Sequence, residues 1–222
     1  MTVLLVLGTF LVFIVLDYAL NSRKVLRTVS AEALTVAARP DSEYVDGFLV
    51  PQNVSYHSGH SWLVRERQNV VRVGADEFAA ALVGKVEHIE LPKPGQWIRQ
   101  GQKVVSFIRD GQKTEMVSPT EGEVMAINPA VIENPALLRQ EPYGKGWLMS
   151  VHVPDEENTT RNLIPRVLVG EWMREAVERL YARQPNLAGA VAADGGRPAE
   201  DLLGALPDHD WKEVTAEFFL TK

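Results

Sequence analysis

The longest apolar stretch of the sequence lies at its start. Residues 2–20, TVLLVLGTFLVFIVLDYAL, contain a single charged residue, Asp17, which lies near one end. As a helix rising about 1.5 Å per residue, this segment spans roughly 28 Å, close to the thickness of the hydrocarbon core of a bilayer. The pattern predicts one transmembrane helix over residues 2–20.

Basic residues follow this stretch and none precedes it. Arg23, Lys24 and Arg27 come just after the apolar run, and Tyr18 is placed to lie at the headgroup level. The positive-inside tendency then predicts an N-terminus outside and a soluble part in the cytoplasm, as in a single-pass protein of a bacterial inner membrane. A cleaved signal peptide is the alternative, although the run has no basic start and no clear cleavage site.

After the apolar run, the pattern of residues along the chain changes twice. Residues 21–53 begin as a basic, helix-favouring piece that ends near Ala38, before Pro40, and they are predicted to form a juxtamembrane stalk. Residues 54–155 then show short runs of alternating apolar and polar residues between Gly and Pro. Many short strands with close turn signals predict a mainly β fold of the barrel or sandwich kind.

Two local patterns inside the β region each predict a particular element. The run VVSFIRDGQKTEMV, residues 104–117, predicts a β-hairpin that turns at Asp110-Gly111. The run DEFAAALV, residues 76–83, predicts a short helix with Asp76 near its start, where a carboxylate suits the helix dipole.

The chain from residue 160 to 222 reads as a helical C-terminal extension. Its apolar residues recur at helical spacing, and Asp210 is placed to cap a helix that begins at Trp211. The extension is rich in large apolar side chains, which either seal an open face of the β domain or form a docking surface for another subunit. These side chains belong to Trp172, Met173, Tyr181, Trp211, Phe218 and Phe219.

The composition of the chain narrows the kinds of binding and chemistry that it can carry. The 222 residues carry a formal net charge of −6 with no basic run, which disfavours a nucleic-acid surface. The sequence has no cysteine, which excludes thiol catalysis, disulfides and cysteine-ligated metal centres. His57 and His60 have a spacing that could reach one metal ion, but no third ligand is visible nearby, so we expect structural histidines and no metal site.

The middle of the chain resembles the glycine cleavage H proteins, which are relatives of lipoyl and biotinyl domains. The matching pieces occur in the order of that family, and they cover roughly residues 54–155. They are HSW at 60–62, VRVGADEFAAALVGKVEHIELPKPG at 71–95, SPTEGEV at 118–124 and INPAVIENPALLRQEPYGKGWL at 127–148. The resemblance implies an H-protein-like fold, to which the transmembrane helix and the C-terminal extension are additions.

The same resemblance implies a lipoyl-bearing lysine at the turn of the hairpin. Counting back from Ser118-Pro119, that position falls on Gly111, and the glutamate that the family usually has three residues earlier is Ile108. Lys113 is two residues away, which displaces an amine by about 6 to 7 Å along a strand. We therefore expect no lipoate, with lipoylation of Lys113 as the alternative.

These patterns together predict a protein that is not an enzyme. We expect a membrane-anchored accessory subunit that uses an unlipoylated H-protein-like domain to bind other subunits of a membrane complex, respiratory or photosynthetic. Its expected partners are the bilayer and those subunits, with neither nucleic acid nor a small-molecule substrate. The alternative is a membrane-tethered lipoyl carrier, modified on Lys113, in an aminomethyl- or sulfur-transfer system.

Overall fold

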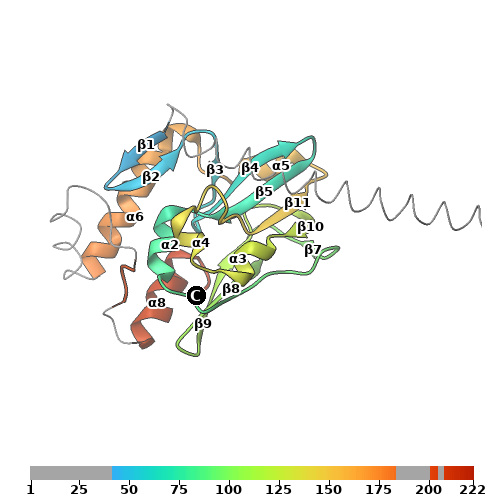
Figure 1. Ribbon diagram of the computed structural model, residues 1–222. Helices are drawn as coiled ribbons and strands as arrows, with labels where there is room; N and C mark the ends of the chain where they lie inside the picture. Colours follow the sequence, from blue (N-terminus) through green and yellow to red (C-terminus); the bar gives the residue numbers. More distant parts are fainter. Residues whose placement is uncertain (1–41, 184–200, 205–207) are drawn as a thin grey trace, which may run out of the picture.

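The computed structural model describes residues 42–183, 201–204 and 208–222 (Figure 1). The predicted transmembrane helix over residues 2–20, with Tyr18 and the flanking Arg23, Lys24 and Arg27, lies outside these described residues, as does the first part of the predicted stalk. Within the ranges that are described, no helix has both the length and the apolar character needed to cross a membrane.

A six-stranded antiparallel sheet forms one side of the β domain. Its strand order is β3-β4-β5-β11-β10-β7. The long neighbouring strands β4 and β5 meet at a Gln68-Asn69 turn, where Asn69 adopts the left-handed conformation with φ 56°. The strand bounds are Ser55–Tyr56 for β3, Ser61–Arg67 for β4, Val70–Ala75 for β5, Trp97–Ile98 for β7, Gly122–Ile127 for β10 and Met149–His152 for β11.

A smaller antiparallel sheet holds the predicted hairpin. It consists of β6 (His88–Glu90), β8 (Lys103–Arg109) and β9 (Gln112–Val117), in the order β6-β8-β9. One face of the hairpin is buried, through Val105, Phe107 and Met116. The alternation of buried and exposed side chains therefore fixes which face of β8 and β9 meets the core.

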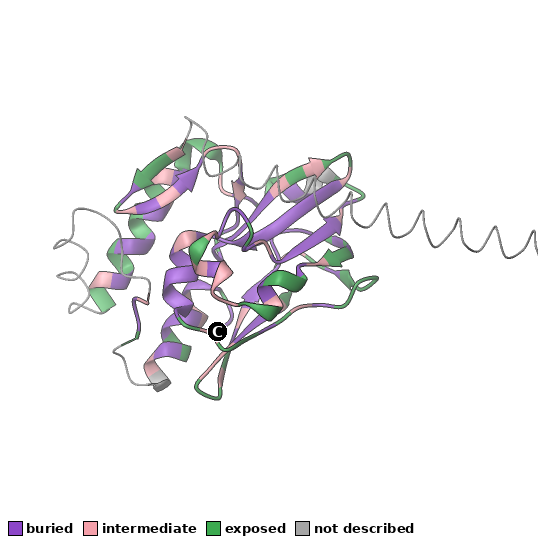
Figure 2. Ribbon diagram, viewed as in Figure 1, coloured by how far each residue is buried: buried purple, intermediate pink, exposed green. Residues whose placement is uncertain are grey.

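The predicted helix after β5 is present as α2 (Glu77–Val83). Asp76 caps it, because its side-chain oxygen accepts a hydrogen bond from the backbone N–H of Ala79. Every residue of α2 after Glu77 is buried, and Figure 2 shows the helix in the interior of the molecule. Three shorter helices complete the loops: α3 (Pro129–Glu133), α4 (Leu137–Gln140) and α5 (Glu156–Arg161). The sequence analysis does not predict them.

One hairpin precedes the predicted β domain. Strands β1 (Ser42–Val45) and β2 (Phe48–Pro51) pair around an Asp46-Gly47 turn, and Val45, Phe48 and Val50 are buried. Phe48 packs edge-on against Phe78 of α2, with ring centroids 5.3 Å apart. Residues 42–53, which the sequence analysis places in the stalk, therefore pack against the folded body just ahead of the domain predicted to begin at residue 54.

The C-terminal extension folds onto the β domain. It contains a short 3₁₀ helix, η1 (Arg166–Leu168), then α6 (Val169–Arg183) and α8 (Asp208–Phe218). In Figure 1, α6 lies along the β1–β2 hairpin and α8 lies next to α2 and β9. Because α8 begins at Asp208, Asp210 falls inside its first turn and is not the N-cap that the sequence analysis predicts.

Candidate functional site

The turn of the β8–β9 hairpin is the position where the resemblance places a modified lysine. Asp110 and Gly111 form this turn with φ values of 49° and 73°, the left-handed pair typical of a tight two-residue hairpin turn. A Cβ built on Gly111 would meet no atom within 4 Å. The tip of the hairpin therefore projects into solvent with no side chain at the family's attachment position.

Lys113 lies on β9 and not in the turn. It pairs across the hairpin with Ile108, and its Nζ donates a hydrogen bond of 2.7 Å to Oε2 of Glu90 on the neighbouring strand β6. This hydrogen bond raises the pKa of Lys113 and lowers the pKa of Glu90. The amine is therefore engaged in an exposed ion pair with Glu90.

Ile108 takes the place that the resemblance gives to an acidic residue. It is half-buried and pairs with His88 on one side and with Lys113 on the other. Two carboxylates of this region are Asp110, whose Oδ2 lies 3.3 Å from Nε of Arg109, and Glu90 in the pair with Lys113. Both carboxylates already have a basic partner.

The inner face of the hairpin is held by the residues that follow α6. We call α6, residues 201–204 and residues 208–222 together the cover. Oγ1 of Thr215 donates a hydrogen bond of 2.8 Å to Oγ1 of Thr114, and Nζ of Lys103 donates one of 2.6 Å to the carbonyl oxygen of Thr221. Phe219 packs against Phe107, with ring centroids 6.1 Å apart. The hairpin is thus fixed along its length by the cover.

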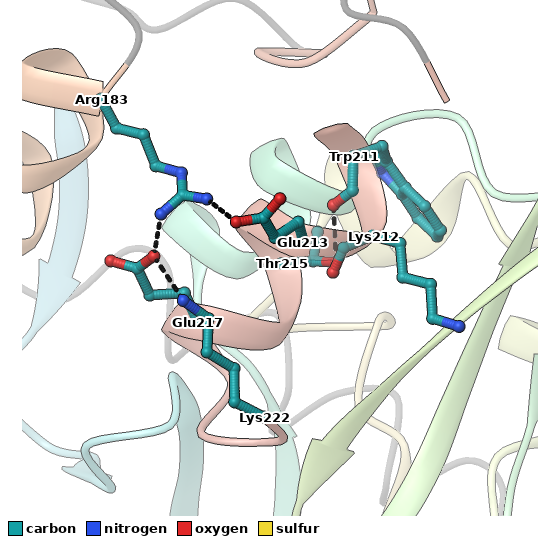
Figure 3. Close-up of polar contacts among 7 residues, drawn as sticks. All are labelled: Arg183, Trp211, Lys212, Glu213, Thr215, Glu217 and Lys222. Atoms are coloured by element: carbon teal, nitrogen blue, oxygen red, sulfur yellow. Dashed lines mark hydrogen bonds and ion pairs between the residues drawn. The ribbon is translucent and has the colours of Figure 1, made fainter. Parts of the chain in front are cut away.

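An open groove of about 710 Å³ lies between the hairpin tip and α8. Gly111, Gln112 and Lys113 line one side, and Lys212, Glu213 and Ala216 line the other. Figure 3 shows Lys212 and Glu213 pointing to different sides of α8, with Glu213 directed towards Arg183 of α6.

Charged side chains join the two helices of the cover on its outer side. Arg183, at the end of α6, forms ion pairs with Glu213 and Glu217 of α8 (Figure 3). Nζ of Lys222 lies 3.0 Å from Oε2 of Glu217. Burial raises the pKa of Glu217, but the hydrogen bond from Lys222 and the charges of Arg183, Lys222 and Arg179 outweigh it, and the net shift is downward.

The two histidines that the sequence analysis considers as metal ligands have structural contacts. Nδ1 of His60 lies 2.9 Å from Oδ2 of Asp76, and its ring stacks between Phe78 and Trp172, at centroid distances of 4.5 and 4.7 Å. Nδ1 of His57 accepts a hydrogen bond from the backbone N–H of Gly59. Burial, together with the charge of His60, lowers the pKa of His57. Among the described residues, no group of three or more potential ligands could hold a metal ion.

The six large side chains proposed as a partner surface are mostly inside the molecule. Met173, Trp211, Phe218 and Phe219 are buried, and Trp172 and Tyr181 are partly buried against the same core. Nε1 of Trp211 donates a hydrogen bond of 3.2 Å to the carbonyl oxygen of Val83 at the end of α2. This burial favours the alternative in which these residues seal the β domain over the one in which they form a docking surface.

Comparison with known proteins places this geometry in a family. The family model for the glycine cleavage H-protein matches residues 54–175, so the match continues past the predicted boundary at residue 155 into α6. A glycine cleavage system H protein of Mycobacterium leprae is 33% identical over 106 residues, which cover 48% of this chain and 80% of that protein. The corresponding protein of Carboxydothermus hydrogenoformans is 32% identical over 119 residues, or 53% of this chain and 89% of that protein.

A solved structure of a glycine cleavage system H protein from Mycobacterium marinum also aligns with the chain. The alignment covers 57% of this chain and 98% of that chain, with 24% sequence identity and a TM-score of 0.49. The family model covers more than half of the chain from Val54 onwards, and the two relatives are at least 30% identical over 80% or more of their own length. The chain therefore belongs to the glycine cleavage H-protein family.

Proposed function

We propose that this protein is a non-catalytic, membrane-anchored accessory subunit, whose H-protein-like domain binds other subunits of a larger membrane complex and carries no lipoate. One observation carries the proposal: the turn of the β8–β9 hairpin is Asp110-Gly111, and the nearby Lys113 is paired with Glu90 on β6. The position that carries the arm in a carrier domain has no side chain here, and the neighbouring amine is paired with Glu90.

The packing of the cover supports a binding role. Thr215 and Phe219 hold the inner face of the hairpin, and Trp211 reaches the end of α2. These contacts add a layer to the H-protein-like domain and leave its exposed strands for a partner. The proposed membrane anchor rests on the sequence of residues 2–20, and the cytoplasmic position of the domain rests on Arg23, Lys24 and Arg27. A respiratory or photosynthetic complex of a bacterial inner membrane is the proposed setting.

One observation favours the second candidate function, a membrane-tethered lipoyl carrier in an aminomethyl- or sulfur-transfer system. Lys113 is half exposed and lies two residues from the hairpin turn, so an enzyme could reach its amine. The relatives in the comparison are named as glycine cleavage system H proteins. Against this candidate, modification of Lys113 must first break its hydrogen bond to Glu90.

Intact-mass measurement of the full chain, produced in a bacterium that lipoylates its own carriers, separates the two candidates. We expect the mass of the unmodified chain. The matched control is Gly111→Lys, which puts an amine at the tip, where an added side chain meets no neighbour. A lipoyl adduct on the control alone supports the accessory subunit. An adduct on the wild type that disappears in Lys113→Ala would overturn it in favour of the carrier.

Orientation and partners need separate measurements. A reporter that is active only in the periplasm, fused after Lys222, should be silent, and alkaline carbonate should leave the protein in the membrane pellet. Purification in mild detergent from the native membrane should recover the protein together with other membrane subunits. An active reporter, or release by carbonate, would contradict the proposed anchor and its orientation.

A further inference from the structure

The segment that leads into α6 exposes apolar side chains without an evident reason in the fold. Pro165, Arg166, Val167 and Leu168 are all exposed, and the side chains of Val167 and Leu168 are 89% and 52% accessible. The flanking Ile164 and Val169 turn inwards to the core. Val167 is the most exposed large apolar residue in the described part of the chain.

This segment lies at the end of the molecule where the described chain begins. Nε of Arg166 lies 3.4 Å from Oε1 of Gln52, and Gln52 directly follows Pro51, the register partner of Ser42. On the other side of the segment, a Cβ on Gly170 would lie 3.9 Å from Cγ2 of Val45, also on β1. The β1–β2 hairpin thus places Ser42, the first described residue, beside η1.

The sequence limits how far this end can be from the proposed anchor. Only residues 28–41 separate Arg27, the last basic residue of the anchor flank, from Ser42. Even fully extended, at about 3.3 to 3.6 Å per residue, this stretch spans no more than about 50 Å. The domain is therefore tethered by the same end that exposes Val167 and Leu168.

We propose that Val167 and Leu168 form a second contact with the membrane, in which η1 inserts into the headgroup region of the bilayer beside the anchor. This inference rests on the proposed membrane anchor. Apolar side chains flanked by a basic residue suit the interface, because the apolar groups leave water while the charged group stays at the headgroups. Arg166 supplies that basic residue.

One acidic side chain near the segment already has a basic partner. Glu171, in the first turn of α6, is exposed but pairs with Arg174, whose Nη1 lies 2.5 Å from Oε2 of Glu171. The contact would orient the domain, since a tether and a second fixed point together restrict rotation. The β8–β9 hairpin, which Figure 1 shows at the opposite end of the molecule from β1 and the start of α6, would then point away from the bilayer.

The absence of cysteine from the sequence allows a clean test. The full chain carrying Val167→Cys is labelled with an environment-sensitive fluorophore and reconstituted in phosphatidylcholine–phosphatidylglycerol vesicles, with or without lipids brominated near the headgroup. The matched control is Lys113→Cys, which is exposed at the far end of the domain. We expect a blue shift and loss of emission with brominated lipid for the label at position 167, and neither for the label at position 113.

The outcomes separate this inference from the proposed function. If the labelled chain floats with the vesicles but position 167 behaves like position 113, the membrane contact is wrong while the anchor stands, and a protein partner becomes the occupant of Val167 and Leu168. If the chain does not float with the vesicles, the anchor fails and the inference fails with it. Equal quenching at both positions would also overturn the inference, because the domain would then have no fixed orientation.

Discussion

The tip of the β8–β9 hairpin and the cover lie next to each other, yet they are built in opposite ways. At the tip, Gly111 has no neighbour within 4 Å of an added Cβ, and Lys113 forms an exposed ion pair. In the cover, Phe218 is 1% exposed and packs against Phe78 of α2 with ring centroids 5.2 Å apart. The stabilising contacts of this region therefore lie under the hairpin and not at its turn.

This difference bears on the function of the domain. A carrier domain needs a modified residue at a free tip, and here the tip has a glycine while the face beneath it is covered by a buried layer. Stability should therefore depend strongly on the cover and weakly on the tip. Five changes test that contrast, from the largest expected effect to the smallest.

Phe218→Ala should have the largest effect on stability. The ring contacts Phe78, lies near His60 and is covered by Arg179, whose Cζ is 5.1 Å from the ring centroid. Because the substitution leaves a cavity in a closed core, we expect a loss of about 3 to 5 kcal/mol in the free energy of unfolding, measured by denaturant titration. Met125→Ala, at a side chain that is 47% exposed, is the control and should change stability by less than about 0.5 kcal/mol. If Phe218→Ala lost as little stability as the control, α8 would not be part of the core.

Asp76→Ala should be the next largest. One carboxylate oxygen caps α2 through the N–H of Ala79, at 2.7 Å, and the other accepts from Nδ1 of His60. Loss of the cap and of the partner of a buried ring should together cost about 2 to 4 kcal/mol in unfolding free energy. Asp76→Asn keeps an oxygen for the cap and should cost clearly less stability. Both variants can be measured by thermal and chemical unfolding. If the two variants lose the same stability, the cap contributes little.

Gly111→Ala tests the tip. A methyl group meets no atom there, so the only cost is the left-handed backbone, which disfavours a Cβ by about 1 kcal/mol. We expect a correspondingly small fall in the midpoint of urea unfolding. Gly74→Ala is the contrasting variant, because its Cβ would lie 2.4 Å from the Trp62 ring and should disrupt the domain. A large effect at Gly111 would indicate a neighbour that the described residues do not include.

Arg183→Ala tests the outer contacts of the cover. The ion pairs with Glu213 and Glu217 are substantially exposed, so their removal should cost no more than about 1 kcal/mol at low salt. The difference from the wild type should shrink as salt is added, because the charges are screened. A salt-independent loss would instead assign the effect to packing of the arginine side chain.

As the pH falls, the contacts of the cover should weaken slightly, and they should do so before those of the core. The pKa of Glu217 is lowered in the fold from its ordinary value of 4.5, so its contribution to stability is present above that value and is lost as the pH falls through the lowered pKa. Glu217→Gln should therefore flatten the fall of stability with pH below about 4.5. The exposed Glu90→Gln, whose partner is Lys113, serves as the comparison at the tip. An unchanged pH profile in Glu217→Gln would contradict the assignment.

Short-range signals in the sequence predict the local elements well. Asp110-Gly111 between alternating residues gives the β8–β9 turn, and Asp76 before an alanine-rich apolar run gives the start of α2. The same signal is present at Asp46-Gly47, where alternating residues on both sides form β1 and β2. The sequence analysis places this hairpin in the stalk, although the rule that predicts the β8–β9 turn applies equally to Asp46-Gly47.

What covers an apolar face cannot be read from its periodicity. Trp172, Ala176 and Leu180 recur every four residues, the spacing of an amphipathic helix, but the pattern is the same whether the face packs on its own domain or on another subunit. The choice depends on contacts far apart in the sequence, such as Trp172 on His60. The ion pair of Lys113 is equally hidden, because its partner Glu90 reaches it only through the β6-β8-β9 order.

The hydrogen bond from Lys103 to Thr221 joins residues that are made at very different times. During synthesis at about 5 to 20 residues per second, the segment around Thr221 leaves the ribosome several seconds after the hairpin. For that interval the face of β8 and β9 lacks the contacts that Thr215, Phe219 and Thr221 make with it in the fold. A chaperone that recognises newly exposed apolar strands would therefore find this protein most readily between the emergence of β9 and the emergence of α8.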